Sequence, residues 1–238
     1  HRDSPASMSI HEEGTISVVA PMMGVFANLV VFDQHAPQNS LDRVQPELAT
    51  GWKWSEDGRK LTFALRDGVK WHDGKPFTAA DVKCTVDLLK GTAKENFKLN
   101  FRKGWYTNVE GVTVGGPLEA TFDLKAPQPG LLALLASGMT PMYPCHVNPR
   151  EMRTNPVGTG PFKFAEYKAN QGIKLVRNPD YWKPGQPYLD GVEWTIIPNR
   201  STAILAFVAG KFDMVFPYEL TVPLVADVKQ QMPDAVCD

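Results

Sequence analysis

Residues 46–82 constrain the fold more than any other part of the chain, because they place turn signals and strand patterns in a fixed order. In Leu61-Thr62-Phe63-Ala64-Leu65 the large apolar side chains occupy every second position, which predicts a strand with one buried face. Three Asp-Gly pairs flank this run, and such pairs are typical of turns. The pattern predicts a meander of short strands at residues 51–54, 60–65 and 69–71.

A helix is expected directly after the last of these turns. Thr78 precedes an alanine pair and Asp81, and this spacing forms a capping box in which Asp replaces the usual Glu. Apolar residues recur at helical spacing from Val82 onward, and Gly91 supplies a C-terminal stop. We therefore expect a helix at residues 79–90.

The rest of the chain carries weaker signals of the same kinds. Helices are expected at residues 22–31, between Pro129 and Gly138, and at 202–209, while residues 94–103 fit an amphipathic helix or a loop. Further strands are expected at 109–115, 120–124, 162–167, 172–177, 189–198 and 213–216, with 189–198 buried. Strands joined to single helices without regular βαβ alternation predict an α/β or α+β fold with a mixed sheet.

Residues 46–82 closely resemble the signature block of the bacterial extracellular solute-binding proteins, family 5, which serve dipeptide, oligopeptide and nickel ABC transporters. The matching residues are Pro46, Leu48, Ala49, Trp52, Asp57, Gly58, Thr62, Phe63, Leu65, Arg66, Gly68, Val69, Lys70, Asp73, Gly74, Pro76, Phe77, Thr78, Ala79, Asp81 and Val82. Two later segments match as well, Asn155-Pro156-Val157-Gly158-Thr159-Gly160-Pro161-Phe162 and Asn178-Pro179-Asp180-Tyr181-Trp182.

The resemblance implies a lobe of the periplasmic-binding-protein type II kind, with a mixed β-sheet flanked by helices and a β-rich subdomain. Residues 1–36 and 151–238 would form the discontinuous base of lobe I, and residues 37–150 the inserted β-rich subdomain. Because family members are longer, the resemblance also implies that lobe II, the first strand and the C-terminal return to lobe I are absent from this chain.

Composition argues against several other classes of function. The 238 residues carry a net charge of −1, so broad attraction to nucleic acid or to an anionic membrane is not expected. We find neither an apolar run long enough to span a bilayer nor a signal peptide. The five histidines are scattered, His72 is expected to be solvated beside a turn, and no common hydrolase or nucleotide-binding motif occurs. We therefore expect no cofactor, no metal site and no catalysis.

The three cysteines do not suggest a disulfide scaffold, because they cannot all pair with one another. Cys84 lies within the helix expected at 79–90, where a small core residue is the simplest interpretation. A disulfide between Cys145 and Cys237 stays open as an alternative.

Three loops are expected to line the ligand cleft. The resemblance places there the loop that follows the family's first strand, an aromatic residue in the position of Trp105, and the segment after the helix that ends at Gly138. The expected ligand-binding residues are Met8, Glu12, Glu13, Thr15, Trp105, Ser137, Gly138, Met139 and Thr140. For Trp105 and Met139, an ordinary core position is the competing interpretation.

The resemblance implies a periplasmic or lipid-anchored extracellular protein that captures a peptide-like or other small solute and delivers it to ABC permease subunits by closure of two lobes. Two alternatives stay open. A secreted hydrolase acting on peptides or sugars would use Glu12 and Glu13 as acid and base, although adjacent carboxylates on a strand point to opposite sides. A sensor or chaperone would keep the same fold without transport. The exposed cleft surface of a lone lobe is also expected to pair with another copy of the chain.

Overall fold

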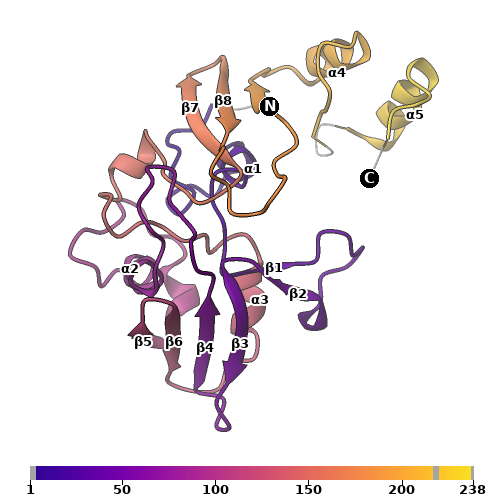
Figure 1. The fold of residues 1–238 in the computed structure, drawn as a ribbon. Coiled ribbons are helices and arrows are strands. Elements are labelled where there is room, and N and C mark those ends of the chain that lie inside the picture. Colours follow the sequence, from indigo (N-terminus) through magenta and orange to yellow (C-terminus); the bar gives the residue numbers. More distant parts are fainter. Residues whose placement is uncertain (1–3, 217–219, 237–238) are drawn as a thin grey trace.

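The computed structural model describes residues 4–216 and 220–236. Its lower part in Figure 1 is built on a four-stranded sheet and its upper part on a three-stranded sheet. The helices are α1 (Ile16–Met22), α2 (Ala79–Lys90), α3 (Leu131–Ala136), α4 (Arg200–Val208) and α5 (Val222–Gln231), with 3₁₀ turns at Leu41–Arg43, Lys103–Tyr106 and Glu151–Arg153. Within the described ranges, no helix is both long and apolar enough to cross a membrane.

The named strands form three antiparallel sheets. The smallest sheet pairs β1 (Val30–Phe32) with β2 (Val44–Pro46). The lower sheet has the order β3 (Ala49–Trp54), β4 (Lys60–Leu65), β6 (Glu119–Leu124) and β5 (Val109–Gly116), and the upper sheet the order β7 (Phe162–Lys168), β8 (Gly172–Arg177) and β9 (Gly191–Thr195). The α/β class is confirmed, although the strands of the described residues form three antiparallel sheets where the sequence suggested one mixed sheet.

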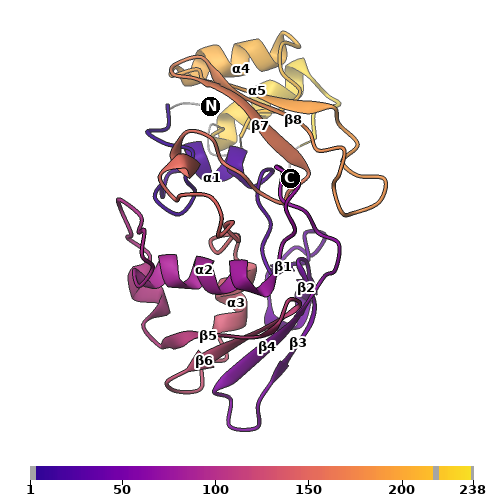
Figure 2. The ribbon, with the colours of Figure 1, turned by 60° about the vertical axis from the view of Figure 1, so that its left-hand side comes forward.

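The lower sheet buries one face, as the alternation in β4 predicted. Leu61 and Phe63 are fully buried, and the Phe63 ring meets Phe122 of β6 edge-on with centroids 5.6 Å apart. On the other face, the hydroxyls of Thr62 and Thr121 share a hydrogen bond of 2.8 Å. Helix α2 crosses above β5 and β6 in Figure 2, so the apolar side chains of helix and sheet form one core.

Helix α2 begins and ends as its sequence signals predicted. The backbone N–H of Thr78 donates to Asp81 Oδ2 at 2.9 Å, which closes the capping box, and Gly91 takes the left-handed conformation with φ of 68°. The second oxygen of the same carboxylate accepts a hydrogen bond from the Cys145 N–H at 2.8 Å. The cap therefore also fixes the segment around residue 145 along the helix.

The cysteine expectations were wrong, because Cys84 and Cys145 form a disulfide in the structure. Their Cα atoms are 5.6 Å apart, within the range that a disulfide requires. The hydrogen bond from the Cys145 N–H to Asp81, one helical turn before Cys84, explains this proximity. Cys237 lies outside the described residues, and its suggested partner is occupied by Cys84.

The helix expected at residues 22–31 was also wrong. The helix lies earlier, at Ile16–Met22, and the chain then runs to β1 without helical structure. The reason is a tertiary contact, since the N–H of Gly160 donates to the Val25 carbonyl at 2.9 Å. A Cβ atom on Gly158 would lie 1.9 Å from the same carbonyl oxygen, which explains why glycines stand in the 155–162 segment.

Three other expected strands differ in the structure, two of them near the C-terminal end. The buried strand expected at 189–198 is the shorter β9, whose residues are half-buried or exposed because it is the last strand of its sheet. Residues 213–216 do not form a strand, although Phe216 stacks on Trp194 of β9 with ring centroids 5.2 Å apart. The short strand expected at 69–71 is reduced to a single bridge between Lys70 and Pro76.

Two sets of side chains join the lower and upper parts. In the first, His72 Nε2 donates to the Gly160 carbonyl at 3.0 Å and Nδ1 accepts from the Gly158 N–H at 3.2 Å. Burial lowers the pKa of His72 to about 4, with a further contribution from the positive charge of Lys163. The expectation that His72 is solvated was therefore wrong, because the ring is held between the two parts as a neutral imidazole.

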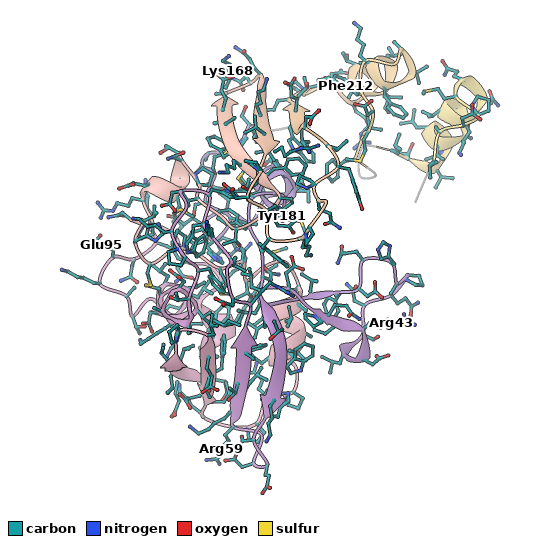
Figure 3. All side chains as sticks on the ribbon, in the orientation of Figure 1. Arg43, Arg59, Glu95, Lys168, Tyr181 and Phe212 are labelled. Atoms are coloured by element: carbon teal, nitrogen blue, oxygen red, sulfur yellow. A yellow bond between two sulfur atoms is a disulfide. The ribbon has the colours of Figure 1, made fainter. Side chains whose placement is uncertain are left out.

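In the second set, Trp182 is the central side chain. The guanidinium carbon of Arg66 lies 4.7 Å from its ring centroid and the Lys183 ammonium lies 4.9 Å away. Lys183 also pairs with Glu47 at 2.7 Å, and the indole N–H donates to the Thr159 carbonyl at 3.2 Å. Figure 3 shows the neighbouring Tyr181 at the junction of the two parts. The Asn-Pro-Asp-Tyr-Trp segment thus anchors the upper part to β3 and β4 and their flanking turns.

Candidate ligand-binding site

Arg102 brings together the three loops that were expected to line the cleft. Its side chain is 1% exposed, and Nη1 donates to the Ile10 carbonyl at 2.6 Å. Its Nη2 donates to the Glu13 carbonyl and to the Met139 sulfur, each at 3.4 Å. One guanidinium thus holds residues 10–13, residues 101–105 and the 137–140 segment at a single place.

Two aromatic rings lie beside this guanidinium and reach the surface. The ring centroid of Phe101 is 4.7 Å from Arg102 Cζ, and that of Trp105 is 5.9 Å from it. Phe101 is 52% exposed and Trp105 is 47% exposed, so both present an apolar face to solvent. The core interpretation of Trp105 is therefore wrong, because the ring packs on Arg102 and stays half open.

Two glycines lie close to exposed apolar side chains next to Arg102 and the 137–140 segment. A Cβ atom on Gly14 would lie 3.2 Å from the Phe101 ring, and one on Gly138 would lie 3.3 Å from the methyl group of Met23. Met23 is 53% exposed. We call the side chains of Met23, Phe101, Trp105 and Met139 the apolar patch. It is formed by segments far apart in the sequence, as a binding surface on loops requires.

Glu12 was expected to line the cleft, but its carboxylate is buried against the backbone of residues 98–99. Oε1 accepts hydrogen bonds from the backbone N–H groups of Lys98 and Leu99 at 2.8 and 3.3 Å, and it pairs with Arg153 at 3.0 Å. The residue is only 2% exposed. Its geometry is that of a residue that positions the loops, and it leaves Glu13 without the paired carboxylate that a hydrolase mechanism needs.

The other expected residues divide into surface and core positions. Met8 and Thr140 are fully buried, and Thr140 shares a hydrogen bond of 2.7 Å with the Tyr106 hydroxyl. Thr15 and Ser137 are exposed, while Glu13, Gly138 and Met139 are half-buried. Contact of any of these residues with a ligand stays a prediction.

His11 contributes to the floor beneath the site. Its ring packs on Tyr143 with centroids 4.4 Å apart, and Nε2 donates to the Pro141 carbonyl at 2.8 Å. Complete burial lowers the pKa of His11 to about 3, and the charge of Arg102 acts in the same direction. The imidazole is therefore neutral at physiological pH. No group of residues suited to hold a metal ion occurs in the described part of the chain.

Sequence reasoning missed Arg102, Phe101 and Met23. A basic residue in a polar segment is normally solvated, so nothing in the sequence marked Arg102 as buried. Phe101 lies four residues after Phe97, and that spacing suggested one face of an amphipathic element. In the structure Phe97 is buried and Phe101 is exposed, because the segment is a loop.

A large cavity lies elsewhere among the described residues. It has a volume of about 860 Å³ and is formed between β8, β9 and residues 211–216, with Trp194, Phe212 and Met214 in its wall. Figure 3 shows Phe212 near α4, far from the lower sheet. None of the residues expected to bind a ligand lines this cavity.

Comparison with known proteins identifies the family. Residues 43–234 match the family described as bacterial extracellular solute-binding proteins, family 5 Middle. A putative ABC transporter peptide-binding protein of Brucella ovis is 31% identical over 202 residues, which is 80% of this chain and 36% of that protein. The glutathione-binding protein GsiB of Escherichia coli is 30% identical over 173 residues, which is 71% of this chain and 33% of GsiB.

Solved structures agree with the sequence matches. The binding protein MoaA of A. tumefaciens R10, determined in complex with mannopinic acid, superposes with a TM-score of 0.80 at 25% identity, over 89% of this chain and 42% of MoaA. The present chain thus spans about a third of the length of the curated relatives that it matches. The fold and the sequence together show that the chain belongs to the bacterial extracellular solute-binding proteins, family 5.

Proposed function

We propose that this chain supplies one wall of the solute site of a binding protein that serves an ABC importer, and that the solute is peptide-like or another small molecule. The observation that carries the proposal is the convergence of three separate loops on Arg102, whose guanidinium lies close to the exposed rings of Phe101 and Trp105. Ligand sites combine apolar area with a few polar groups in this manner. The peptide-binding and glutathione-binding relatives support the solute class.

The mechanism that we propose is closure of this wall against a second one, followed by docking on permease subunits outside the cytoplasmic membrane, in the periplasm or on a lipid anchor. Residues 1–36 and 151–238 would act as the base of the lobe, and residues 37–150 as its inserted subdomain. The contacts of His72 and Trp182 support motion of these parts as one body, because they tie the lower sheet to the upper one.

A ligand screen tests the proposal. Small peptides, glutathione, metal chelates and sugars are titrated into the 238-residue chain while tryptophan fluorescence and thermal stability are recorded. We expect a peptide-like compound to change the fluorescence, and the change to disappear in Trp105→Phe. Trp52→Phe is the matched control, since Trp52 lies in β3 of the lower sheet. A response that survives in Trp105→Phe, or no response to any compound, would contradict the proposal.

We also propose that the chain alone binds its solute weakly, because it spans only about a third of its curated relatives. Tight peptide binding by calorimetry would contradict this expectation. The apolar patch is further proposed to mediate pairing of two copies at high concentration. Analytical ultracentrifugation tests that pairing, and a strictly monomeric chain would exclude it.

A further inference from the structure

We propose that the Cys84–Cys145 disulfide is a site of reversible reduction by a dithiol, and that its reduction loosens the loop of residues 8–13 in the wall of the solute site. The inference rests on the proposed function, because that loop belongs to the wall. It goes further by assigning a reactant to the disulfide and a means of regulation to the site. We call residues 140–145 the connecting segment, since they join the disulfide to the loop.

The first argument is the position of the disulfide at the surface. Cys145 is exposed and Cys84 is half-buried, so the Cys145 side of the bond is open to a thiolate in solvent. Exposed disulfides are the labile and regulatory ones, whereas structural disulfides resist reduction. The position of this pair therefore fits a bond that is exchanged in the folded chain.

The second argument is that the connecting segment is attached to α2 beside the disulfide. The Cys145 N–H donates to Asp81 Oδ1 at 2.8 Å, and the Tyr143 N–H donates to Thr85 Oγ1 at 2.8 Å. Thr85 follows Cys84 directly in the helix. The segment contains neither helix nor strand, so its position on α2 depends on these contacts and on the S–S bond.

The third argument is that the connecting segment also contacts the loop. The Pro141 carbonyl accepts a hydrogen bond from His11 Nε2 at 2.8 Å, and the Tyr143 hydroxyl shares a hydrogen bond of 3.1 Å with Ser9. The rings of Tyr143 and His11 have centroids 4.4 Å apart. Ser9, His11 and Tyr143 are all buried, so displacement of the segment must displace the loop packed on it.

The reaction is a thiol–disulfide exchange. One thiolate of the dithiol attacks Sγ of Cys145, the S–S bond breaks, and Cys84 leaves as a thiolate that takes up a proton. The second thiolate of the dithiol then attacks the dithiol's own sulfur in the mixed disulfide and releases Cys145. Two electrons pass to the protein, and the dithiol becomes a disulfide.

Reduction removes the covalent link and leaves the hydrogen bonds of the connecting segment in place. The folded state is therefore retained, while the segment and the loop open more often. Local openings of this kind are measured by amide hydrogen exchange, because an N–H group exchanges when its hydrogen bond breaks.

The first measurement is reduction in the folded state. The Cys237→Ser chain is used, because it keeps only the two cysteines of the disulfide. Dithiothreitol is added without denaturant, and thiols are alkylated and located by mass spectrometry. We expect two thiols, at residues 84 and 145. A disulfide that resists dithiothreitol until urea unfolds the chain would overturn the inference.

The second measurement is hydrogen exchange of the same chain before and after reduction. The N–H groups of Met8, Glu12 and Glu13 are hydrogen-bonded to Arg153 and Ser9 carbonyls, and we expect them to exchange at least about threefold faster after reduction. Amides of β8 should keep their rates, and reoxidation should restore slow exchange in the loop. Unchanged exchange in the loop would overturn the inference. Equal acceleration in β8 would overturn it too, because the disulfide would then support the whole chain.

The Cys84→Ser, Cys145→Ser double variant in the Cys237→Ser background is the matched control. It should exchange like the reduced chain and should not respond to dithiothreitol. If this variant fails to fold, the reduction and reoxidation of the Cys237→Ser chain still decide the matter. Neither measurement needs a bound solute, so the ligand screen decides separately on the proposed function.

Discussion

His72 and Gly158 form two hydrogen bonds with each other. The backbone N–H of His72 donates to the Gly158 carbonyl at 2.9 Å, and the N–H of Gly158 donates to His72 Nδ1 at 3.2 Å. The two residues lie in different parts of the molecule, one after the lower sheet's β4 and one before β7 of the upper sheet. This pairing fixes the tautomer of the ring, because Nδ1 must accept while Nε2 donates to Gly160.

The first prediction is that lowering the pH destabilises the folded chain, because His72 is neutral in the folded state. Its pKa is about 4 in the folded chain and 6.5 in the unfolded chain, so the unfolded state binds an extra proton between these values. The free energy of unfolding should therefore fall as pH decreases from 6.5 to 4, by on the order of 3 kcal/mol for this group.

The test compares urea unfolding of the unchanged chain and of His72→Gln across that pH range. The difference between the two proteins removes the contribution of His11, which is present in both. Lys163, which lowers the pKa, and Asp73, which raises it, are also retained in both proteins. Parallel stability curves would show that His72 does not titrate as described.

The second prediction concerns the disulfide between Cys84 and Cys145. It closes a loop with a sequence separation of 61 residues, so its removal should lower the free energy of unfolding by about 4 kcal/mol in the chain-entropy treatment. Urea unfolding of the Cys84→Ser, Cys145→Ser double variant measures the loss.

Thiol titration in denaturant, without reductant, provides the companion measurement. One free thiol is expected from the three cysteines, and after proteolysis residues 84 and 145 should be joined in one peptide pair. Three reactive thiols, or a linkage that includes residue 237, would contradict the pairing.

The third prediction separates the two adjacent glutamates. Glu12→Gln should cost about 3 kcal/mol of stability, because it removes the buried charge that pairs with the half-buried Arg153. Glu13→Gln should change the stability by less than about 0.5 kcal/mol, since its side chain makes no ion pair among the described residues. The measurement is denaturant unfolding of both variants, and equal losses would show that Glu12 does not hold the loop.

The fourth prediction compares two tryptophans of similar size. Trp182→Ala should destabilise the chain by about 3 kcal/mol, because the ring packs against Arg66 and Lys183 and its N–H donates a hydrogen bond to the Thr159 carbonyl. Trp105→Ala should cost less than about 1 kcal/mol, since its ring is half exposed. Thermal unfolding of the two variants measures both losses of stability. A greater loss for Trp105→Ala than for Trp182→Ala would contradict the prediction.

Much of the lower part could be predicted from sequence because its signals are local. The alternation in β4 and the capping box of α2 each involve residues within a few positions of one another, and both were confirmed. The hairpin of β5 and β6 was predicted for the same reason. Local rules of this kind also carried the resemblance to the family.

The failures share a different cause, which is contact between segments far apart in the chain. Residues 23–29 have a helical pattern, but the backbone of Val25 bonds to Gly160 instead. The Cys84–Cys145 disulfide depends on a hydrogen bond to Asp81 that no sequence pattern reveals. In the candidate site, the ligand contacts of the three loops stay a prediction. The sequence did not mark Arg102 as the residue that joins these loops, because its burial depends on carbonyl groups at residues 10 and 13.

We propose that the solute contacts the surface around Arg102. The most direct test is the ¹⁵N chemical-shift map of the 238-residue chain, recorded with the peptide-like compound that gives the strongest response in the screen. We predict shifts concentrated at residues 12–16, 99–105 and 137–140. Shifts concentrated instead at residues 189–195 and 211–216, around the cavity beside β9, would contradict the account.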